Sequence, residues 1–541
     1  MLKGFHLKSY KSHLPFLLVF FYPWIILCAI GFFEIPFLKN YLTELIGFGL
    51  FSLILFCILL LLKNRIKFLH LFFMFLMSFL MVAKLSFYHH YSVKLSSSAW
   101  FVILETHSSE ALSFLNNYFD AYTIILLIIV FLPCIGLIFS KVFKTKYNAL
   151  FKVPISLKTR AVLGLVILVF SVGIYKKFNK ENLILMSLSS YNEYQTFKKQ
   201  FESELAQKTS KHLEVISSVV EPQTYVVVIG ESTSSWHMQL YGYHRETNPK
   251  LSEIKNDLIV FDSVIVPNVH TIISLEKILT FSDNKTPNRK ENTSIIQLAN
   301  QAGFNTYWIS SQRPIGFHES VAATIARAAT TRVYTNTENH DYQILDGSLL
   351  PELDIILNDE HKKRLIFVHL IGTHLPYAKR YPESFEFFKN DEIQSQYKHE
   401  KAYKNTNAYD NAIRYNDHIV RSIIDKVKSK KTISYVTYLS DHGDEVYDSM
   451  DFLGHNEYHA TRPMYEVPFL VWFSAAYKDK FGRYEDRTIK FRTYNLEDFI
   501  YSFSEISQIQ FKGFDERKSI FNPNFTKRTR WIKKNIDYDN R

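Results

Sequence analysis

The sequence predicts an α/β protein in two parts, an N-terminal bundle of membrane helices and a following α/β domain outside the membrane. Before about residue 180 the chain is dominated by Phe, Leu, Ile and Val, whereas short β-branched runs that end in acidic or histidine residues come later. At 541 residues the chain also exceeds the roughly 100 to 200 residues of one domain. We expect a membrane domain over residues 1–175, a linker over 176–222 and a second domain over 223–541.

Five apolar runs in the first part are long enough, or nearly so, for the roughly 20 residues of a membrane-spanning helix. A buried core helix could explain one such run, but five in succession favour a five-helix transmembrane bundle. The first run contains Pro23 and Trp24 and no small-residue cleavage pattern follows it, so it does not resemble a cleavable signal. The runs are Leu14 to Phe33, Leu45 to Leu62, Phe68 to Tyr88, Ala121 to Ser140 and, the shortest, Ala161 to Tyr175.

Basic residues beside these runs predict the orientation of the bundle. Lysine and arginine gather before the first run and in the connections that follow the second and fourth runs. Such clusters face the cytoplasm, so the N-terminus is expected inside and everything after about Lys176 outside. The formal net charge of +11 is then explained by topology and contact with anionic lipids rather than by nucleic-acid binding.

Cysteine usage limits the chemistry of the outer domain. All three cysteines lie in the apolar runs, so a metal in the outer domain would be held by oxygen and imidazole ligands. They are Cys28, Cys57 and Cys134.

Two connecting segments carry helical patterns. In the outer connection over residues 89–120, Trp100 to Tyr118 reads as one or two interfacial amphipathic helices. It either packs against the bundle or presents a lipid headgroup to the outer domain. The polar stretch 176–222 is expected to form a bridging helix, and Pro222 marks the start of the outer domain.

Three strand patterns in the outer domain end in candidate ligands. The β-branched run Val226 to Ile229 is typical of a strand buried on both faces, and Glu231 follows it at once. Taken alone, Glu231 could equally belong to a capped turn. The runs Ser434 to Ser440 and Arg364 to Leu370 repeat the pattern. Because ligands bind beyond the carboxyl ends of strands in such sheets, we expect a metal site that brings together Glu231, His374, Asp441 and His442.

Thr271 is a candidate nucleophile. It follows a strand-like stretch, Leu258 to Val266, and precedes an apolar segment that reads as a helix, whose first N–H groups could bind an anion. A hydroxyl is a poor nucleophile until a base or a metal lowers its pKa, which zinc can do while neutralising phosphate charge. The simple alternative is that Thr271 only caps the helix.

The motifs of the outer domain resemble, as a set, the phosphoethanolamine transferases of Gram-negative inner membranes, which modify lipopolysaccharide and related envelope substrates. The resemblance covers essentially the whole chain. The matching pieces are Gly230-Glu231-Ser232-Thr233, Leu240-Tyr241-Gly242-Tyr243, Arg245-Glu246-Thr247-Asn248-Pro249, His270-Thr271, Ser274-Leu275, Tyr307-Trp308-Ile309-Ser310, His369 to Tyr377, Ser440-Asp441-His442-Gly443, Gly454-His455-Asn456 and Val467-Pro468-Phe469.

The resemblance implies an alkaline-phosphatase/sulfatase-like three-layer α/β/α domain and a two-step transfer. Thr271 would attack the phosphorus of phosphatidylethanolamine, release diacylglycerol and pass the phosphoethanolamine to an acceptor oxygen. Glu231, Asp441, His442 and the Thr271 oxygen match the zinc ligands of the family, with one Zn²⁺ expected and room for a second. His374 and His455 match histidines of the phosphate site, where either could bind phosphoryl oxygens, protonate the leaving group or help hold a second metal.

Some positions depart from the family pattern. Thr106 and Glu110 match positions that contact the lipid headgroup, yet Val102 stands where the family has Asn. Ser234 and Ser235 stand near the place where members acting on lipid A often carry Arg.

The acceptor and the reaction class remain open at this point. The stretch around Gly454 to Asn456 and Thr461 to Glu466 is closer to the branch that modifies core sugars, so a core heptose acceptor is favoured and lipid A is the alternative. A membrane-anchored phosphatase or phosphodiesterase of the same fold, or a non-catalytic scaffold, are competing hypotheses. We expect the protein to be a monomer in the bacterial inner membrane, with its catalytic domain in the periplasm.

Overall fold

The structure, a computed structural model, forms two compact units, residues 1–194 and 195–541, which are described separately. This division falls inside the predicted linker. The described residues are 17, 18, 20–34, 38–62, 66–91, 120–139, 156–179, 182–286, 292–312, 321–336, 344–389, 391–457, 459–482, 487–533 and 535–541.

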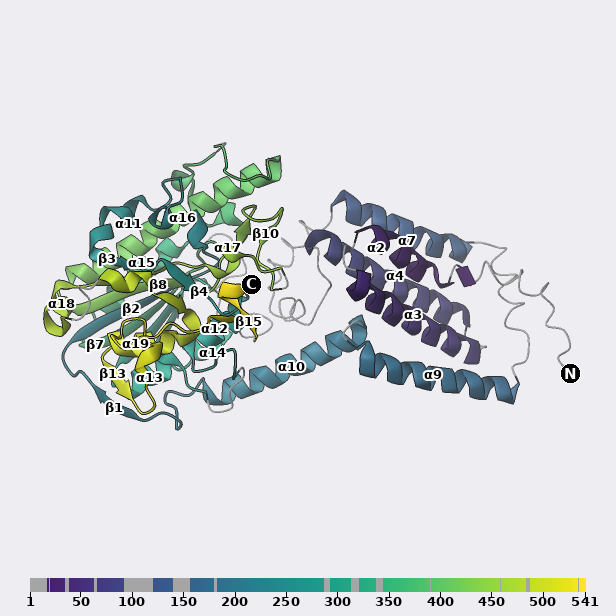
Figure 1. Ribbon diagram of the computed structural model, residues 1–541, viewed down its shortest axis with the longest axis horizontal. Helices are drawn as coiled ribbons and strands as arrows, with labels where there is room; N and C mark the ends of the chain where they lie inside the picture. Colours follow the sequence, from purple (N-terminus) through teal and green to yellow (C-terminus); the bar gives the residue numbers. More distant parts are fainter. Residues whose placement is uncertain are drawn as a thin grey trace. The chain divides into compact units, whose positions relative to one another are not determined.

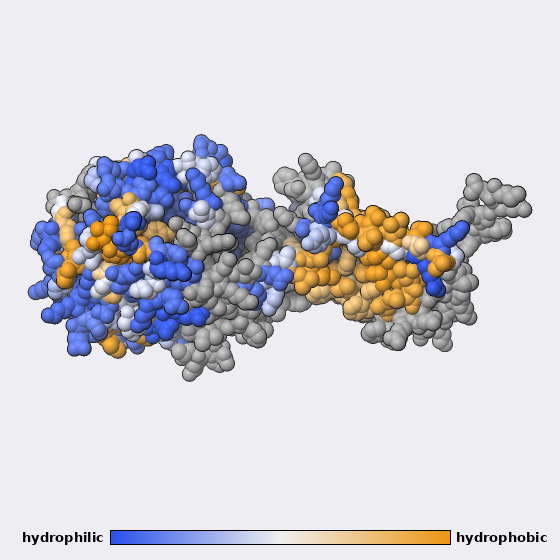
Figure 2. Space-filling view, turned by 90° about the horizontal axis from the view of Figure 1, so that it is seen from below, coloured by the Kyte–Doolittle hydropathy of each residue, from blue (hydrophilic) through white to orange (hydrophobic). Residues whose placement is uncertain are grey.

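The first unit consists of apolar helices that pack through a shared core. Large side chains such as Leu27, Phe48, Met77 and Leu126 are buried between them. Figure 2 shows apolar side chains over much of the visible described surface of this unit, and exposed residues such as Phe79, Ile128 and Leu165 are apolar too. An apolar core with an apolar exterior is typical of helices in a bilayer. The helices are α2 (Tyr22–Glu34), α3 (Leu38–Leu61), α4 (Ile66–Tyr91), α7 (Ala121–Phe139), α9 (Leu157–Lys177) and the start of α10 (Leu183–Glu204).

Three described helices are long and apolar enough to span a membrane, at Tyr41–Leu61, Leu69–His89 and Leu157–Lys177. The third was expected to be the shortest span but has 21 residues. The predicted bundle of five is therefore confirmed only in part. In the described part of the first run, α2 has 13 residues, and in the fourth run the apolar stretch is Ala121–Leu132. The predicted amphipathic segment, with Thr106 and Glu110, lies outside the described residues.

The second unit is built on a seven-stranded sheet with the order β3-β11-β8-β2-β7-β5-β6. The central strand β2 pairs in parallel with β7 and β8, so that Ile229 lies opposite His369 and Leu439. The three predicted strands are therefore neighbours, with their carboxyl ends at one edge. The strands are β2 (Gln223–Gly230), β3 (Leu258–Val260), β5 (Asn305–Ser310), β6 (Thr331–Tyr334), β7 (Lys363–His369), β8 (Ile433–Ser440) and β11 (Phe469–Phe473).

Helices cover both faces of this sheet (Figure 1). Val226 and Val228 pack in one core with α11 (Pro249–Glu253), α15 (Leu349–Leu357) and α16 (Glu400–Ser429). Tyr225 points to the other face, where its ring stacks on Tyr435. This alternation buries β2 completely on both sides. The helices below this second face are α12 (Thr271–Leu279), α13 (Ile295–Gln301), α14 (Val321–Ala326) and α19 (Phe499–Ile506).

The predicted single strand Leu258 to Val266 is wrong in one respect. It is broken after β3, and β4 (Ser263–Ile265) pairs with β12 (Thr493–Asn495) in a separate two-stranded sheet. After β3, the backbone N–H of Asp262 donates to the carbonyl of Lys490 and not to a residue of β11, so the pairing with β11 ends there. The remaining elements are β1 (Val215–Ser218), β9 (Glu445–Val446), β10 (Leu453–Gly454), α17 (Arg462–Tyr465), α18 (Ala475–Phe481), β13 (Ile509–Phe511), β14 (Trp531–Ile532) and β15 (Ile536–Asp537).

Candidate metal centre and active site

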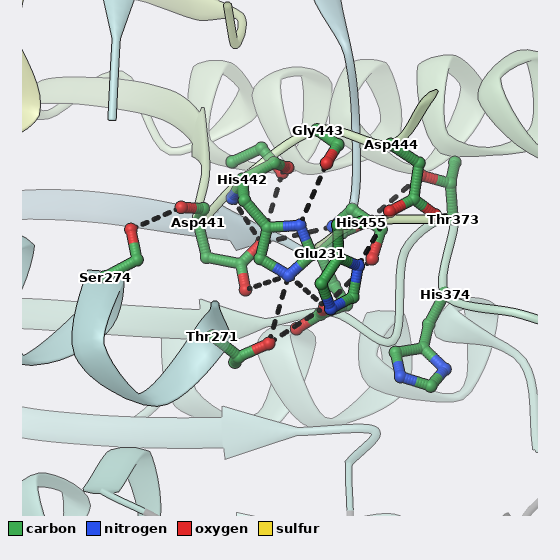
Figure 3. A network of polar contacts seen from close by, with 12 residues as sticks. Glu231, Thr271, Ser274, Thr373, His374, Asp441, His442, Gly443, Asp444 and His455 are labelled. Carbon is green, nitrogen blue, oxygen red and sulfur yellow. Dashed lines mark hydrogen bonds and ion pairs between the residues drawn. The ribbon is translucent and has the colours of Figure 1, made fainter. Parts of the chain in front are cut away.

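Four predicted site residues meet beyond the carboxyl ends of β2 and β8 (Figure 3). Glu231 follows β2, Asp441 and His442 follow β8, and Thr271 is the first residue of α12. The Thr271 Oγ1 lies 3.1 Å from His442 Nε2 and 3.4 Å from Glu231 Oε1. His442 Nε2 lies 3.3 Å from Glu231 Oε1 and 3.4 Å from Asp441 Oδ2. Four donor atoms from three elements therefore converge on one point.

Asp441 and His442 each direct one side-chain atom, Oδ2 and Nε2, at this point. Asp441 Oδ1 accepts the backbone N–H groups of Ser232 at 3.1 Å and His442 at 2.8 Å. Its Oδ2 is buried and, among the described residues, has no hydrogen-bond partner. His442 Nδ1 donates to the carbonyl of Gly443 at 3.1 Å, which leaves Nε2 as the ligand atom in the neutral ring. Bonds of this kind orient metal ligands.

Glu231 is held in place by side chains that sequence reasoning did not single out. Its Oε1 accepts from the Ser232 hydroxyl at 3.0 Å, and its Oε2 lies 3.4 Å from Gln312 Nε2. Gln312 also donates to the carbonyl of Leu370 at 2.7 Å. Gln312 therefore ties the carboxylate to the end of β7.

The pKa values show how crowded this cluster is. Burial, together with the charge of Glu231, raises the pKa of Asp441 to about 8. Burial alone would lower the pKa of His442, but the carboxylates of Asp441 and Glu231 raise it to about 10. Burial also opposes ionisation of Glu231, whose pKa is nevertheless held well below its usual value by the hydrogen bond and charge of His442. The charge that balances these carboxylates is therefore a proton, which a divalent cation could replace.

The cluster fits a zinc ion. Oxygen and nitrogen donors from Glu231, Asp441, His442 and Thr271 give the four ligands that Zn²⁺ prefers. The buried Asp441 Oδ2 faces the other donor atoms and has no hydrogen-bond partner among the described residues. Bound zinc would lower the pKa of an attached hydroxyl and neutralise phosphate charge. A second group of metal-ligating side chains among the described residues shares His442 and adds Asp444 and His455.

The two other predicted histidines have different surroundings. The His455 ring lies 4.0 Å from the His442 ring, centroid to centroid, and its Nδ1 lies 2.8 Å from Asp444 Oδ1. His374 follows β7 and lies to the side of the cluster (Figure 3), where its Nδ1 donates to the carbonyl of Leu375 at 2.7 Å. His455 is therefore integrated into the cluster, whereas His374 lines its margin.

For three further histidines, His237, His270 and His459, the sequence predicts a packing or surface role rather than a catalytic one. His237 is buried and lies 2.6 Å from an oxygen of Asp410 and 3.2 Å from Asp448. The His270 ring is 6.4 Å from the His455 ring. His237 therefore belongs to a buried ion-pair network, and its described contacts are not with the expected zinc ligands.

Sequence reasoning missed Asp444, Gln312 and Glu457. Asp444 could have been found, because it lies two residues after His442 in the acidic stretch Asp441 to Glu445 that follows a strand pattern. Gln312 and Glu457 have no such signal, because each acts through a contact with a residue far away in the sequence.

Comparisons with known proteins agree with this site. The sulfatase family matches residues 223–509. The phosphoethanolamine transferase EptC of Escherichia coli (strain K12) is 31% identical over 488 residues, which cover 85% of this chain and 84% of EptC.

Two solved structures resemble the chain. The C-terminal periplasmic domain of E. coli EptC in complex with Zn is 35% identical, with a TM-score of 0.58, and covers 61% of this chain and 96% of that domain. The integral membrane lipooligosaccharide phosphoethanolamine transferase A of Neisseria meningitidis has a TM-score of 0.63 at 18% identity and covers 95% and 97% of the two chains, so it shows a common fold. The chain therefore belongs to the sulfatase family and, within it, to the phosphoethanolamine transferases.

Proposed function

We propose that this enzyme transfers phosphoethanolamine from phosphatidylethanolamine to lipopolysaccharide, in two steps that use Thr271 as the nucleophile. The observation that carries the proposal is the position of the Thr271 hydroxyl, 3.1 Å from His442 Nε2 and 3.4 Å from Glu231 Oε1. A hydroxyl placed among three metal-ligating side chains has the means to become an alkoxide at neutral pH.

The first step is an in-line displacement at phosphorus. Thr271 Oγ1 forms a bond to the phosphorus of the donor, the bond to the diacylglycerol oxygen breaks, and that oxygen takes up a proton. Glu231, Asp441 and His442 would hold the zinc ion, which supplies positive charge for the phosphoryl oxygens and lowers the pKa of the hydroxyl. His455 lies beside His442 and is the better placed of the two remaining histidines to exchange a proton with the oxygen that leaves or attacks.

The second step regenerates the enzyme. An acceptor hydroxyl or phosphate oxygen attacks the phosphorus of the phosphoethanolamine-threonine, and the Thr271 oxygen leaves. We favour a core heptose of lipopolysaccharide as the acceptor, with lipid A as the alternative. The name of the Neisseria relative, a lipooligosaccharide phosphoethanolamine transferase, supports an acceptor of this class.

The proposed location is the bacterial inner membrane. The apolar helices of the first unit would anchor the enzyme as a multi-pass protein with a cytoplasmic N-terminus, and residues 223–541 would work in the periplasm as a monomer. The described helices that are long and apolar enough to span a membrane, at Tyr41–Leu61, Leu69–His89 and Leu157–Lys177, support this location. An envelope enzyme anchored in this way has its lipid donor in the same bilayer.

The first test is to find the covalent intermediate. Detergent-purified protein is incubated with phosphatidylethanolamine, with and without EDTA, and its peptides are mapped by mass spectrometry. We expect phosphoethanolamine on the Thr271 peptide and release of diacylglycerol, both abolished by EDTA. Thr271→Ala should lose both while it stays folded, and Thr271→Ser should retain part of the activity because the hydroxyl remains.

Two results would contradict the proposal. An adduct on another residue, or full activity of Thr271→Ala, would exclude Thr271 as the nucleophile. Release of free phosphoethanolamine at the same rate with and without lipopolysaccharide would favour the hydrolase hypothesis over transfer.

A further inference from the structure

The turn that leads into α12 is fixed by a side chain from a distant loop. Glu457 Oε1 accepts from Asn268 Nδ2 at 2.9 Å, and Glu457 Oε2 accepts the backbone N–H of Val269 at 2.9 Å. Val269 is two residues before Thr271, so this carboxylate holds the backbone from which the nucleophile projects. Glu457 is also two residues after His455. One loop therefore carries a histidine of the site and the group that fixes the turn before the nucleophile.

The other side of Asn268 faces a buried cation from the helix of Thr271. Lys277 Nζ donates to Asn268 Oδ1 at 2.5 Å and to Asn284 Oδ1 at 2.5 Å. The side chain is 2% exposed. A buried ammonium group is costly unless it is hydrogen-bonded, so these two amide oxygens are required partners.

The chemistry of the three groups allows one direction of hydrogen bonding. Lys277 can only donate and an ionised Glu457 can only accept, so the Asn268 amide must turn its oxygen to Lys277 and its nitrogen to Glu457. We call this chain of contacts, from Lys277 through Asn268 to Glu457, the turn clamp. It joins α12 to its own preceding turn and joins both to the His455 loop.

We propose that Glu457 is a positioning residue for the transfer reaction, acting through the turn clamp to keep Thr271 Oγ1 at the metal-ligand cluster. The inference rests on the proposed function, since it takes Thr271 to be the nucleophile. A second contact holds the same helix from the other side, because the Ser274 hydroxyl donates to the carbonyl of Asp441 at 2.5 Å. With the helix anchored at Ser274 and the turn at Val269, the residue between them has little freedom.

Placement of the hydroxyl matters for rate because a displacement of about 1 Å of a reacting group can cost about 100-fold. A turn released from Glu457 would let Thr271 move without unfolding α12, whose later turns stay packed on the core. Loss of the clamp should therefore reduce kcat more than it reduces binding of the donor, because it displaces the attacking hydroxyl and leaves the rest of the protein in place.

Exchanging the two polar side chains of the clamp provides a sharp test. Asn268→Asp alone places a second carboxylate against Glu457. Glu457→Gln alone removes an acceptor, so that one of the two N–H groups facing it, or Lys277, loses its partner. In the double variant, Gln at position 457 can accept from Val269 N–H and donate to Asp at position 268, which in turn accepts from Lys277. Every hydrogen bond of the original clamp then has a counterpart.

The experiment uses the full-length protein in detergent with zinc, phosphatidylethanolamine and lipopolysaccharide. We expect each single variant to lower kcat by about 10- to 100-fold with KM within about twofold. The double variant should return to within about threefold of the original kcat, as expected for residues that act as a coupled pair. Zinc affinity, measured by competition with a chelating dye, should weaken in each single variant and recover in the double variant, because Thr271 is one of the expected ligands.

Asp417→Asn is the matched control. Asp417 is another buried carboxylate that accepts backbone N–H groups, those of Lys250 at 2.8 Å and Leu251 at 2.9 Å, but it lies between α11 and α16. Its replacement should lower the melting temperature and leave kcat per folded molecule unchanged. This control separates a general loss of stability from displacement of the nucleophile.

The outcomes distinguish this inference from the proposed function. If the single variants lower only the melting temperature, or the double variant is as slow as the slower single variant, Glu457 is not a positioning residue. If the unaltered protein forms no adduct at Thr271, the proposed function fails, and zinc affinity decides about the clamp. Weaker zinc affinity in the single variants and its recovery in the double variant would still show that the clamp positions Thr271. Unchanged zinc affinity in the single variants would overturn the inference.

Discussion

The two carboxylate oxygens of Asp441 have different roles, one in orienting the side chain and one as an expected metal ligand. Its Oδ1 accepts backbone N–H groups of Ser232 and His442, which fixes the carboxylate plane, while Oδ2 is left for a metal. Ser232 has a φ of 58°, a strained conformation for a non-glycine residue that costs on the order of 1 kcal/mol or more. In this conformation the backbone N–H of Ser232 points at Asp441. The turn after β2 therefore helps to orient Asp441, an expected metal ligand that follows β8.

Gly443 has no room for a side chain, and we predict that Gly443→Ala disrupts zinc binding. A Cβ there would lie 2.2 Å from the carbonyl oxygen of Pro463 and 3.0 Å from Ser234 Cα, both of which are backbone atoms. The chain would have to shift next to His442, with a cost of about 1–3 kcal/mol in stability. Zinc content by atomic spectroscopy and the melting temperature would both fall.

A glycine in open surroundings serves as the control for this prediction. Gly173 in α9 has nothing within 4 Å of a built Cβ, so Gly173→Ala should leave zinc content unchanged. Normal zinc content in Gly443→Ala would show that the loop tolerates the shift and that the close approach is not needed to place His442.

The residues of the site differ in how well they could be predicted. Glu231, Asp441 and His442 stand directly after strand patterns, and the sheet brings strand ends together, so their meeting could be expected from the sequence. Thr271 needed the resemblance to a family, because a Thr that starts a helix is usually only a cap. Gln312 and Glu457 depend on side-chain contacts across more than 80 residues, which periodicity cannot reveal.

At the scale of secondary structure, the buried strands were the most predictable elements. β2, β7 and β8 are buried along nearly their whole length because helices cover both faces of the sheet, and each has an apolar centre. The stretch from β3 to β4 has a similar composition but changes sheet at Asp262, and that change depends on the carbonyl of Lys490. A run of apolar residues thus predicts burial, whereas the identity of the partner strand is a property of the fold.

A buried ion-pair network links the loop after β2 to α16 and to the loop after β8. His237 contacts Asp410 and Asp448 at opposite ring nitrogens, and Arg245 and Tyr243 also bond to Asp410. Burial alone would lower the pKa of His237, but the charges of Asp448 and Asp410 raise it to about 10. The side chain of His237 is therefore a charged imidazolium in the folded protein at neutral pH.

We predict that His237→Gln destabilises the protein by up to about 3–5 kcal/mol at pH 7, because it removes the cation that Asp448 contacts and one of the two that pair with the buried Asp410. The stabilisation by His237 is complete below its unfolded pKa of about 6.5 and is lost as the pH rises through about 10. The difference in melting temperature between the original protein and His237→Gln should therefore narrow between pH 7 and pH 10.

An exposed ion pair provides the comparison for His237. His399 lies 2.9 Å from Asp451 with both side chains largely exposed, and its Nδ1 caps α16 by accepting the backbone N–H of Ala402 at 3.1 Å, so His399→Gln should cost about 1 kcal/mol, chiefly from the lost cap. A gap between the original protein and His237→Gln that stays constant from pH 7 to pH 10 would mean that His237 is not charged in the folded state.

At the scale of the whole molecule, the two units differ in the polarity of their surfaces. The first is apolar on its surface as well as in its core (Figure 2), and its described helices include three that can span a bilayer. The second contains the sheet, the proposed zinc ligands and the proposed nucleophile Thr271. The chemistry can therefore be assigned to residues 195–541, and the role of the first unit becomes a question about access to the donor.

We predict that residues 195–541 produced alone keep the chemistry and lose efficient use of a membrane-bound donor. The isolated unit should bind zinc and form the Thr271 adduct with short-chain phosphatidylethanolamine in solution, because every described contact of the metal-ligand cluster lies within it. With phosphatidylethanolamine in vesicles its rate should fall at least about tenfold below that of the full-length enzyme in the same vesicles, since anchoring raises the effective concentration of donor. The same unit with Thr271→Ala controls for adducts that arise without catalysis. Equal rates on vesicles would show that the outer domain extracts its donor unaided, and a failure to bind zinc would place part of the metal site outside residues 195–541.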